Sequence, residues 1–152
     1  MIYVECKPDL LLVNSLGVQK RNIVHAGNIS KVCKGLAKST HAKGLVDEDP
    51  SGDRPRYLDT LRLLQNQHEI TLLRDDKRAN HVIVLCPRLE EWIIKATEEA
   101  GVNIGRYHLP NEGEKLHRVI NFDLRKMERL ISDLKEESER INVLKSYLKE
   151  ST

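Results

Sequence analysis

The sequence predicts one α/β domain with a largely parallel sheet, helices on both faces of that sheet and one antiparallel hairpin. Three short apolar runs, at 2–6, 22–26 and 43–49, are separated by stretches long enough for helices. This alternation is typical of βαβ crossovers and therefore of parallel strands. Two further runs, at 70–76 and 81–87, have only four residues between them. Because a crossover helix does not fit into that gap, these two runs predict an antiparallel hairpin.

The first two helices are predicted from residues at their ends. Pro8 suits the first turn of a helix, where its missing N–H does no harm, and the apolar run 10–13 continues that helix until it stops near Gly17. Gly27 closes the second strand. Ser30 is the expected cap of the next helix.

Two more helices are predicted in the middle of the chain. Residues 57–67 place Leu58, Leu61 and Leu64 on one stripe, as an amphipathic helix does. Residues 88–100 form another helix, which Gly101 ends.

The C-terminal part of the chain is predicted to be helical after a loop at 101–113. The segment 114–150 contains no glycine or proline, and its apolar residues recur at steps of three and four. This pattern indicates an amphipathic helix or a broken helical pair. We therefore expect a Rossmann-like α/β domain at 1–112 and a helical extension at 113–152, which either packs on that domain or forms a contact with a second copy or another protein.

Composition limits the classes of partner. The chain has 152 residues and a net charge of +2, so we do not expect wholesale electrostatic capture of nucleic acid, although a local basic patch is compatible with it. Aromatic residues make up 4%, too few for a base-stacking platform. No apolar run reaches the roughly 18–20 residues of a membrane span, so no membrane partner is expected. The three widely spaced cysteines fit reduced thiols in the cytoplasm.

Acidic residues fall at the ends of two predicted strands. Glu5 ends the first strand, and Asp47 and Asp49 end the third. Residues two apart in an extended chain point to the same side, so Asp47 and Asp49 can face one ion while Glu48 points away. Oxygen-only ligands at the carboxyl edge of such a sheet select Mg²⁺, Mn²⁺ or Ca²⁺ over zinc. The alternative interpretation is that each acid only caps a helix or lies in a solvated loop.

Two motifs resemble signatures of the Toprim family. The segment VECKPD at 4–9 looks like a strand that ends in Val-Glu-Gly-x-x-Asp, and DEDPSG at 47–52 looks like Asp-x-Asp-x-x-Gly. The resemblance covers about residues 1–95, makes Asp9 part of the first signature, and places Gly27 where such domains usually turn. It implies the fold shared by topoisomerases, bacterial primases and a group of nucleases. One departure is Cys6, which stands where the family usually has glycine.

A third match concerns the segment CPRLEEWI at 86–93, which is similar to the overcoming-lysogenization-defect nucleases and related Toprim proteins. In these proteins an acid followed by an aromatic and an aliphatic residue opens the helix after a late strand. By this resemblance Glu90 joins the site and Trp92 packs behind it. The simpler interpretation is that Glu90 is a first-turn acid stabilised by the helix dipole.

The resemblance implies Mg²⁺- or Mn²⁺-dependent phosphodiester chemistry. Glu5 would act as general acid or base, Asp47 and Asp49 would hold one metal, and Glu90 would help with a second. Basic residues for contacts with phosphate are sought in Arg54 and Arg56, which follow the acidic turn, and in Lys31 with its helical neighbours at 34 and 38. Lysines on a helix face are also the ordinary pattern of a solvated surface.

Three functional hypotheses remain open. The first is a metal-dependent nuclease acting on DNA or RNA. The second is a non-catalytic Toprim-fold metal-binding or regulatory module that docks a partner. The third is an unrelated doubly wound fold such as a phosphoryl-accepting receiver, which needs a lysine on a late strand. No lysine follows the HVIVLC run, which argues against a receiver.

Overall fold

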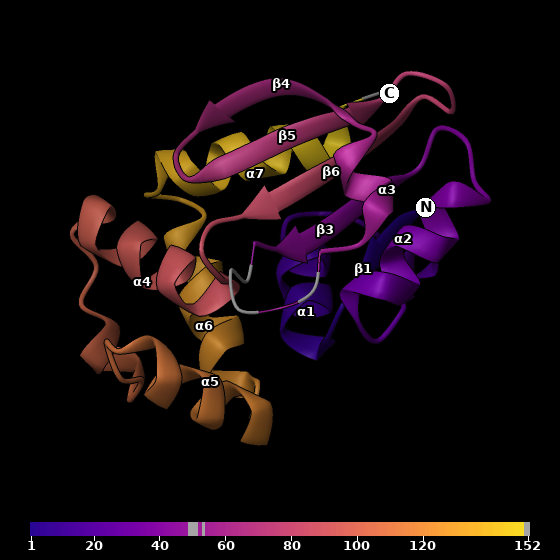
Figure 1. Cartoon of the computed structure of the whole chain (residues 1–152). Coiled ribbons are helices and arrows are strands. Elements are labelled where there is room, and N and C mark those ends of the chain that lie inside the picture. The colour runs from indigo at the N-terminus through magenta and orange to yellow at the C-terminus, as the bar shows by residue number, and fades with distance from the viewer. Residues whose placement is uncertain (49–51, 53, 151–152) are drawn as a thin grey trace.

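A computed structural model of the chain describes residues 1–48, 52 and 54–150, and it contains one mixed sheet (Figure 1). The strand order is β2-β1-β3-β6-β5-β4. The strands are β1 (Ile2–Val4), β2 (Ile23–His25), β3 (Lys43–Asp47), β4 (Arg62–Gln67), β5 (Ile70–Asp75) and β6 (Asn80–Leu85). The predicted class, α/β with a mostly parallel sheet, is confirmed in this form.

The parallel half of the sheet determines where a ligand site is expected. Strands β2, β1, β3 and β6 all pair in parallel, so their carboxyl ends lie along one edge. The chain passes from β1 to β2 on one side and then returns to β3 on the other side of β1. Sheets of this kind bind ligands at such a point of reversal, outside the carboxyl ends of the strands. Here the point of reversal lies between β1 and β3.

The other half of the sheet corrects one prediction. Strands β5 and β6 form the expected antiparallel pair, but a second antiparallel pair joins β4 to β5. The helix predicted over 57–67 is wrong, because helix α3 spans only Arg56–Asp59 and β4 follows it. The leucine spacing was misleading because β4 is an edge strand. Most of its side chains are exposed, so they do not show the apolar alternation of a buried strand.

The helices surround the sheet. They are α1 (Lys7–Ser15), α2 (Ile29–Ala37), α3 (Arg56–Asp59), α4 (Leu89–Ala100), α5 (Gly113–Phe122), α6 (Arg125–Leu134) and α7 (Glu139–Lys149), with short 3₁₀ turns η1 (Lys20–Asn22) and η2 (Ile104–Tyr107). Pro8 lies in the first turn of α1, as predicted. The predicted cap Ser30 is wrong, because Asn28 caps α2 by accepting a hydrogen bond from the Lys31 N–H at 2.9 Å. Gly101 ends α4 in the left-handed conformation.

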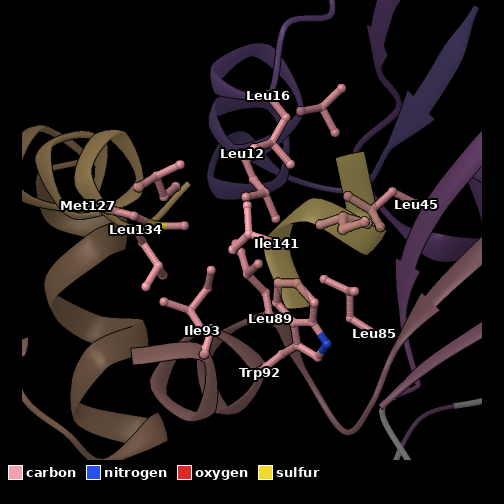
Figure 2. Close-up of a cluster of buried hydrophobic side chains, with 14 of the residues drawn as sticks. Leu12, Leu16, Leu45, Leu85, Leu89, Trp92, Ile93, Met127, Leu134 and Ile141 are labelled. Carbon is pink, nitrogen blue, oxygen red and sulfur yellow. The ribbon is translucent and has the colours of Figure 1, made fainter. Parts of the chain in front are cut away.

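Each face of the sheet has its own apolar core. Val4 and Leu45 contribute to the larger core, which lies against α1 and α4 to α7, whereas Val46 faces the smaller core under α2 and α3. Figure 2 shows the larger core, where side chains from α1, α4, α6 and α7 meet those of the strands. The largest fully buried side chain in it is Trp92.

The C-terminal segment forms three helices rather than one or two. Helix α5 ends at Phe122, and α6 begins at Arg125 after the Asp123 carboxylate accepts a hydrogen bond from the Arg125 N–H at 3.0 Å. Ser138 caps α7 by accepting from the Ile141 N–H at 3.1 Å. The three helices contribute to the same core as α1 and α4. Within the described part of the chain, no helix combines the length and apolar character needed to cross a bilayer.

Gly35 brings α2 into close contact with β1. A methyl group on Gly35 would lie 2.4 Å from the ring of Tyr3, whose hydroxyl lies 2.9 Å from the Ser39 hydroxyl. Alanine is normally the better helix former by up to about 1 kcal/mol. We nevertheless expect Gly35→Ala to lower the free energy of unfolding by about 1–3 kcal/mol, because the ring must move in a packed core. Urea unfolding followed by circular dichroism measures this difference, and a more stable variant would contradict the close contact.

Candidate functional site

Glu5 and Asp47 lie next to each other at the point of reversal between β1 and β3. Glu5 directly follows β1, and Asp47 is the last residue of β3. The Glu5 carboxylate accepts a hydrogen bond from the backbone N–H of Asp47 at 2.9 Å. The Asp47 carboxylate in turn accepts from the N–H of Leu89, the first residue of α4, at 3.1 Å. The ends of two strands and the start of a helix are thus joined through two carboxylates.

Asp9 adds a third carboxylate from the first turn of α1, and it is only 1% exposed. Its Oδ2 atom accepts from the backbone N–H of Cys6 at 3.3 Å and from the Cys6 thiol at 3.1 Å. Its Oδ1 atom is buried and finds no hydrogen-bond partner among the described residues. A buried carboxylate oxygen without a partner is costly, and such an atom calls for an explanation such as an unseen ion or water.

Glu90 is the fourth carboxylate, in the first turn of α4, and it is only 5% exposed. Its Oε1 atom lies 2.8 Å from Nδ1 of His117, a residue of α5. The neighbouring Glu91 points elsewhere, because it pairs with Arg88. The two acids in the first turn of α4 therefore have different partners, His117 for Glu90 and Arg88 for Glu91.

The charges of these carboxylates act on the pKa values of Asp47 and Asp9. Burial raises the pKa of Asp47, and the negative charges of Asp9, Glu5 and Glu90 raise it further. Burial also raises the pKa of Asp9, as do the charges of Glu5 and Glu90. The Cys6 thiol, which donates to Asp9, has a pKa raised by burial and by the charge of Asp9, so it stays protonated. Carboxylates in such an arrangement favour either protons or a cation.

The chemistry of these donors fits a hard divalent cation, although their present geometry is not that of a formed site. All four acids offer oxygen, the ligand that Mg²⁺ and Mn²⁺ prefer, and the buried Asp9 Oδ1 has an unused acceptor. Among the described residues, however, no three His, Cys, Asp or Glu side chains are already arranged to hold a metal. The reason is visible for Glu5 and Asp47, whose oxygens face backbone N–H groups.

The remaining predicted residues lie in different places. Asp49 lies outside the described residues, so its predicted pairing with Asp47 stays a prediction. Gly27 has a positive φ of 110° in the turn between β2 and α2, which favours glycine. Lys31 is exposed in the first turn of α2. The start of α2 follows the carboxyl end of β2, so Lys31 belongs to the same edge as the acids.

The two arginines predicted to contact phosphate, Arg54 and Arg56, lie at different edges of the sheet. The charge of Arg54 and that of Glu5 both influence the pKa of Cys33, which burial raises to about 11, so Arg54 lies within electrostatic range of this edge. Its guanidinium pairs with Asp59 at 3.2 Å on the exposed surface. Arg56 instead lines a surface hollow of about 440 Å³ beside the β5–β6 turn. That turn precedes β6 and lies at the opposite edge of the sheet, away from the acids.

His117 is the residue of this region that sequence reasoning missed. It is separated from Glu90 by 27 residues and belongs to the C-terminal segment. Neither spacing nor motif linked the two, because the contact depends on how α5 packs against α4.

Comparisons of the chain with protein-family models, curated proteins and solved structures gave no match.

Proposed function

We propose that the carboxyl edge of this sheet binds Mg²⁺ or Mn²⁺ and cleaves phosphodiester bonds in nucleic acid. The observation that carries the proposal is the convergence of Glu5, Asp9, Asp47 and Glu90 from three segments at the point where the strand order reverses. Four buried or half-buried acids repel one another, and this arrangement is stable mainly when protons or a cation neutralise it. The buried, unpartnered oxygen of Asp9 supports a cation as the natural occupant.

The chemistry follows from the roles that these side chains are able to take. Asp47, Asp9 and Glu90 are the candidate holders of the cation, together with Asp49. A bound divalent cation supplies charge neutralisation at phosphate oxygens and lowers the pKa of bound water. Glu5 is less buried than Asp9 and Glu90, and we assign it the proton transfer to or from the reacting oxygen. Arg54 and Lys31 would contact phosphates beside the acids.

The motif resemblance supports the same assignment independently of charge. Each of the two Toprim-like motifs starts at the end of a parallel strand, and the two strands are neighbours in the sheet. Glu5 and Asp47, the first acids of the two motifs, are joined by a hydrogen bond of 2.9 Å. Motif residues 42 positions apart in the chain are thus brought into contact by the fold.

The proposal is tested with purified protein and labelled single- and double-stranded DNA and RNA, with Mg²⁺, Mn²⁺ or a chelator. We expect cleavage by the wild type only with a metal. Glu5→Gln and Asp47→Asn remove one charge each but keep the shape of the side chain, so both should lower the rate by at least about 100-fold. Glu136→Gln is the matched control, because this exposed acid lies in the turn after α6, and it should cleave like the wild type.

Equal residual cleavage in the wild type and in both site variants would show that a contaminant is responsible and would refute the nuclease.

One observation favours the non-catalytic module as the second candidate. The thiol of Cys6 lies 3.1 Å from the Asp9 carboxylate, at the position where the family resemblance expects glycine. A metal-dependent gain in thermal stability without cleavage of any substrate would favour that module.

A further inference from the structure

We infer that His117 is a positioning residue of this site: it holds the Glu90 carboxylate in place, so that the C-terminal helical segment forms part of the cation site. The inference rests on the proposed metal site, but not on catalysis by it. Its basis is the contact of 2.8 Å between His117 Nδ1 and Glu90 Oε1, which joins α5 to α4 beside the acidic cluster.

Glu90 needs such a partner because of its surroundings. It lines a narrow apolar gap between α4, α5 and α6, together with residues such as Leu89, Leu116 and Met127. A buried carboxylate beside apolar side chains needs a polar partner, because an unpaired one is costly. We assign the proton of the ring to Nδ1, so that the His117 imidazole donates to Glu90. An N–H donor in contact with a buried carboxylate gives a strong, oriented hydrogen bond and fixes the direction of the carboxylate.

Helix α5 is attached firmly enough to place His117 there. Arg88, at the start of α4, pairs with Glu91 and also with Glu114 of α5 at 2.9 Å. Gly113 lets these groups approach, because a methyl group on it would overlap the Glu91 carboxylate. The Asn121 amide nitrogen donates to the backbone oxygen of His117 at 2.7 Å and lies 3.2 Å from the same Nδ1 atom that contacts Glu90. The ring is thus held at the helix surface by its own helix and by α4.

The orientation of Glu90 matters for a cation because Glu90 contributes to the negative potential at Asp9 and Asp47. Groups that orient a metal ligand without binding the metal typically change its affinity by about 10–100-fold. His117 is 52% exposed, so its removal takes away little apolar packing. The effect of its loss should therefore appear in metal affinity rather than in folding.

The 152-residue chain and its variants are compared by Mn²⁺ titration, with free Mn²⁺ followed by electron paramagnetic resonance. Asparagine carries an amide nitrogen close to the position of histidine Nδ1, whereas the glutamine amide reaches that of Nε2. We therefore expect His117→Asn to bind Mn²⁺ nearly as the wild type does. His117→Ala and His117→Gln should bind it at least about tenfold more weakly. Arg118→Ala is the control, because it shortens an adjacent exposed side chain of the same helix.

Circular dichroism checks that all variants remain folded, and ¹⁵N spectra of the imidazole should show that adding Mg²⁺ shifts the His117 signals. Unchanged affinity in His117→Ala, with Mn²⁺ binding by the wild type intact, would refute this inference alone. Equal weakening in His117→Asn and His117→Ala would refute the role of the Nδ1 hydrogen bond. A wild type that binds no Mn²⁺ at millimolar concentration would refute the inference and the metal site together.

Discussion

Trp92→Ala is expected to lower the free energy of unfolding by about 3–5 kcal/mol, the usual cost of removing a large aromatic side chain from a core. Trp92 is 0% exposed and lies on α4 in the middle of the larger core (Figure 2). Because small domains are stable by only about 5–15 kcal/mol, this loss is a large fraction of the total. It corresponds to a fall in melting temperature of roughly 6–20 °C, measured by circular dichroism.

Besides packing in the core, Trp92 makes a hydrogen bond through its indole nitrogen. It donates to the backbone oxygen of His68 at 2.9 Å. His68 and Glu69 form the two-residue turn between β4 and β5, and both have positive φ values, of 53° and 54°. Such turns normally use asparagine and glycine, so this one depends on outside support. Arg140 provides part of that support, since it lies over the Trp92 ring and pairs with Glu69.

Trp92→Phe separates packing from the hydrogen bond. It keeps much of the ring but removes the donor, and it should cost about 1–2 kcal/mol. Tyr107→Phe is the matched control, because its hydroxyl bonds to Asp133 on the exposed surface, and it should change stability by less than about 0.5 kcal/mol. If Trp92→Phe were as stable as the wild type, the turn would not depend on the indole nitrogen.

The sequence predicted those elements that combine a buried apolar run with a clear start and end. The first three strands, the helix after Pro8 and the helix that ends at Gly101 follow from apolar runs with clear boundaries, and the structure confirms them. The errors occur at an exposed edge strand and at helix ends that carry polar caps. Strand β4 is exposed along most of its length, so its Leu64 was assigned to one helical stripe with Leu58 and Leu61, which precede the strand. The breaks at Asp123 and Ser138 use polar caps instead of glycine or proline, which hid them within an unbroken apolar pattern.

The pattern of apolar runs predicted the part of the candidate site that follows strand ends, and the family resemblance added Asp9 and Glu90. Glu5 and Asp47 were found because parallel strands end at one edge, and the structure places them in contact. The roles of Asp49 and of the metal itself stay predictions. His117 was not predicted, because its contact with Glu90 depends on how α5 packs against α4. Arg56 shows the converse: closeness in sequence to the acidic turn did not place it beside the acids.

Asp47→Asn is expected to stabilise the metal-free protein at pH 8, by at least about 1.4 kcal/mol, the equivalent of one pKa unit. The folded protein raises the pKa of Asp47 by burial and by the nearby charges of Asp9, Glu5 and Glu90. Keeping this carboxylate ionised therefore costs folding free energy. In the wild type the Asp47 carboxylate accepts a hydrogen bond from the N–H of Leu89 at 3.1 Å. Asparagine removes the charge but still offers an amide oxygen to this N–H.

The direction of the pH dependence follows from proton binding. Between the ordinary pKa of an aspartate and the raised pKa of Asp47, the folded state holds more protons than the unfolded state. The contribution of Asp47 to stability is then highest at low pH and is lost as pH rises through that window. The difference in stability between Asp47→Asn and the wild type should therefore grow from pH 4 upward. Urea unfolding at several pH values with a chelator present measures it, and the exposed Asp133→Asn is the control.

A divalent cation should reverse the order of the two proteins. A ligand that binds only the folded state at 100 times its Kd adds about 2.7 kcal/mol of stability, and the wild type should gain this with Mg²⁺ or Mn²⁺. Asp47→Asn should gain much less, because it has lost a negative ligand. If Asp47→Asn were instead less stable than the wild type without metal, the carboxylate would serve mainly as a cap of α4 through Leu89. A site that is destabilising when empty and stabilising when filled is the behaviour that separates a cation site from a helix cap, because a cap stabilises in both conditions.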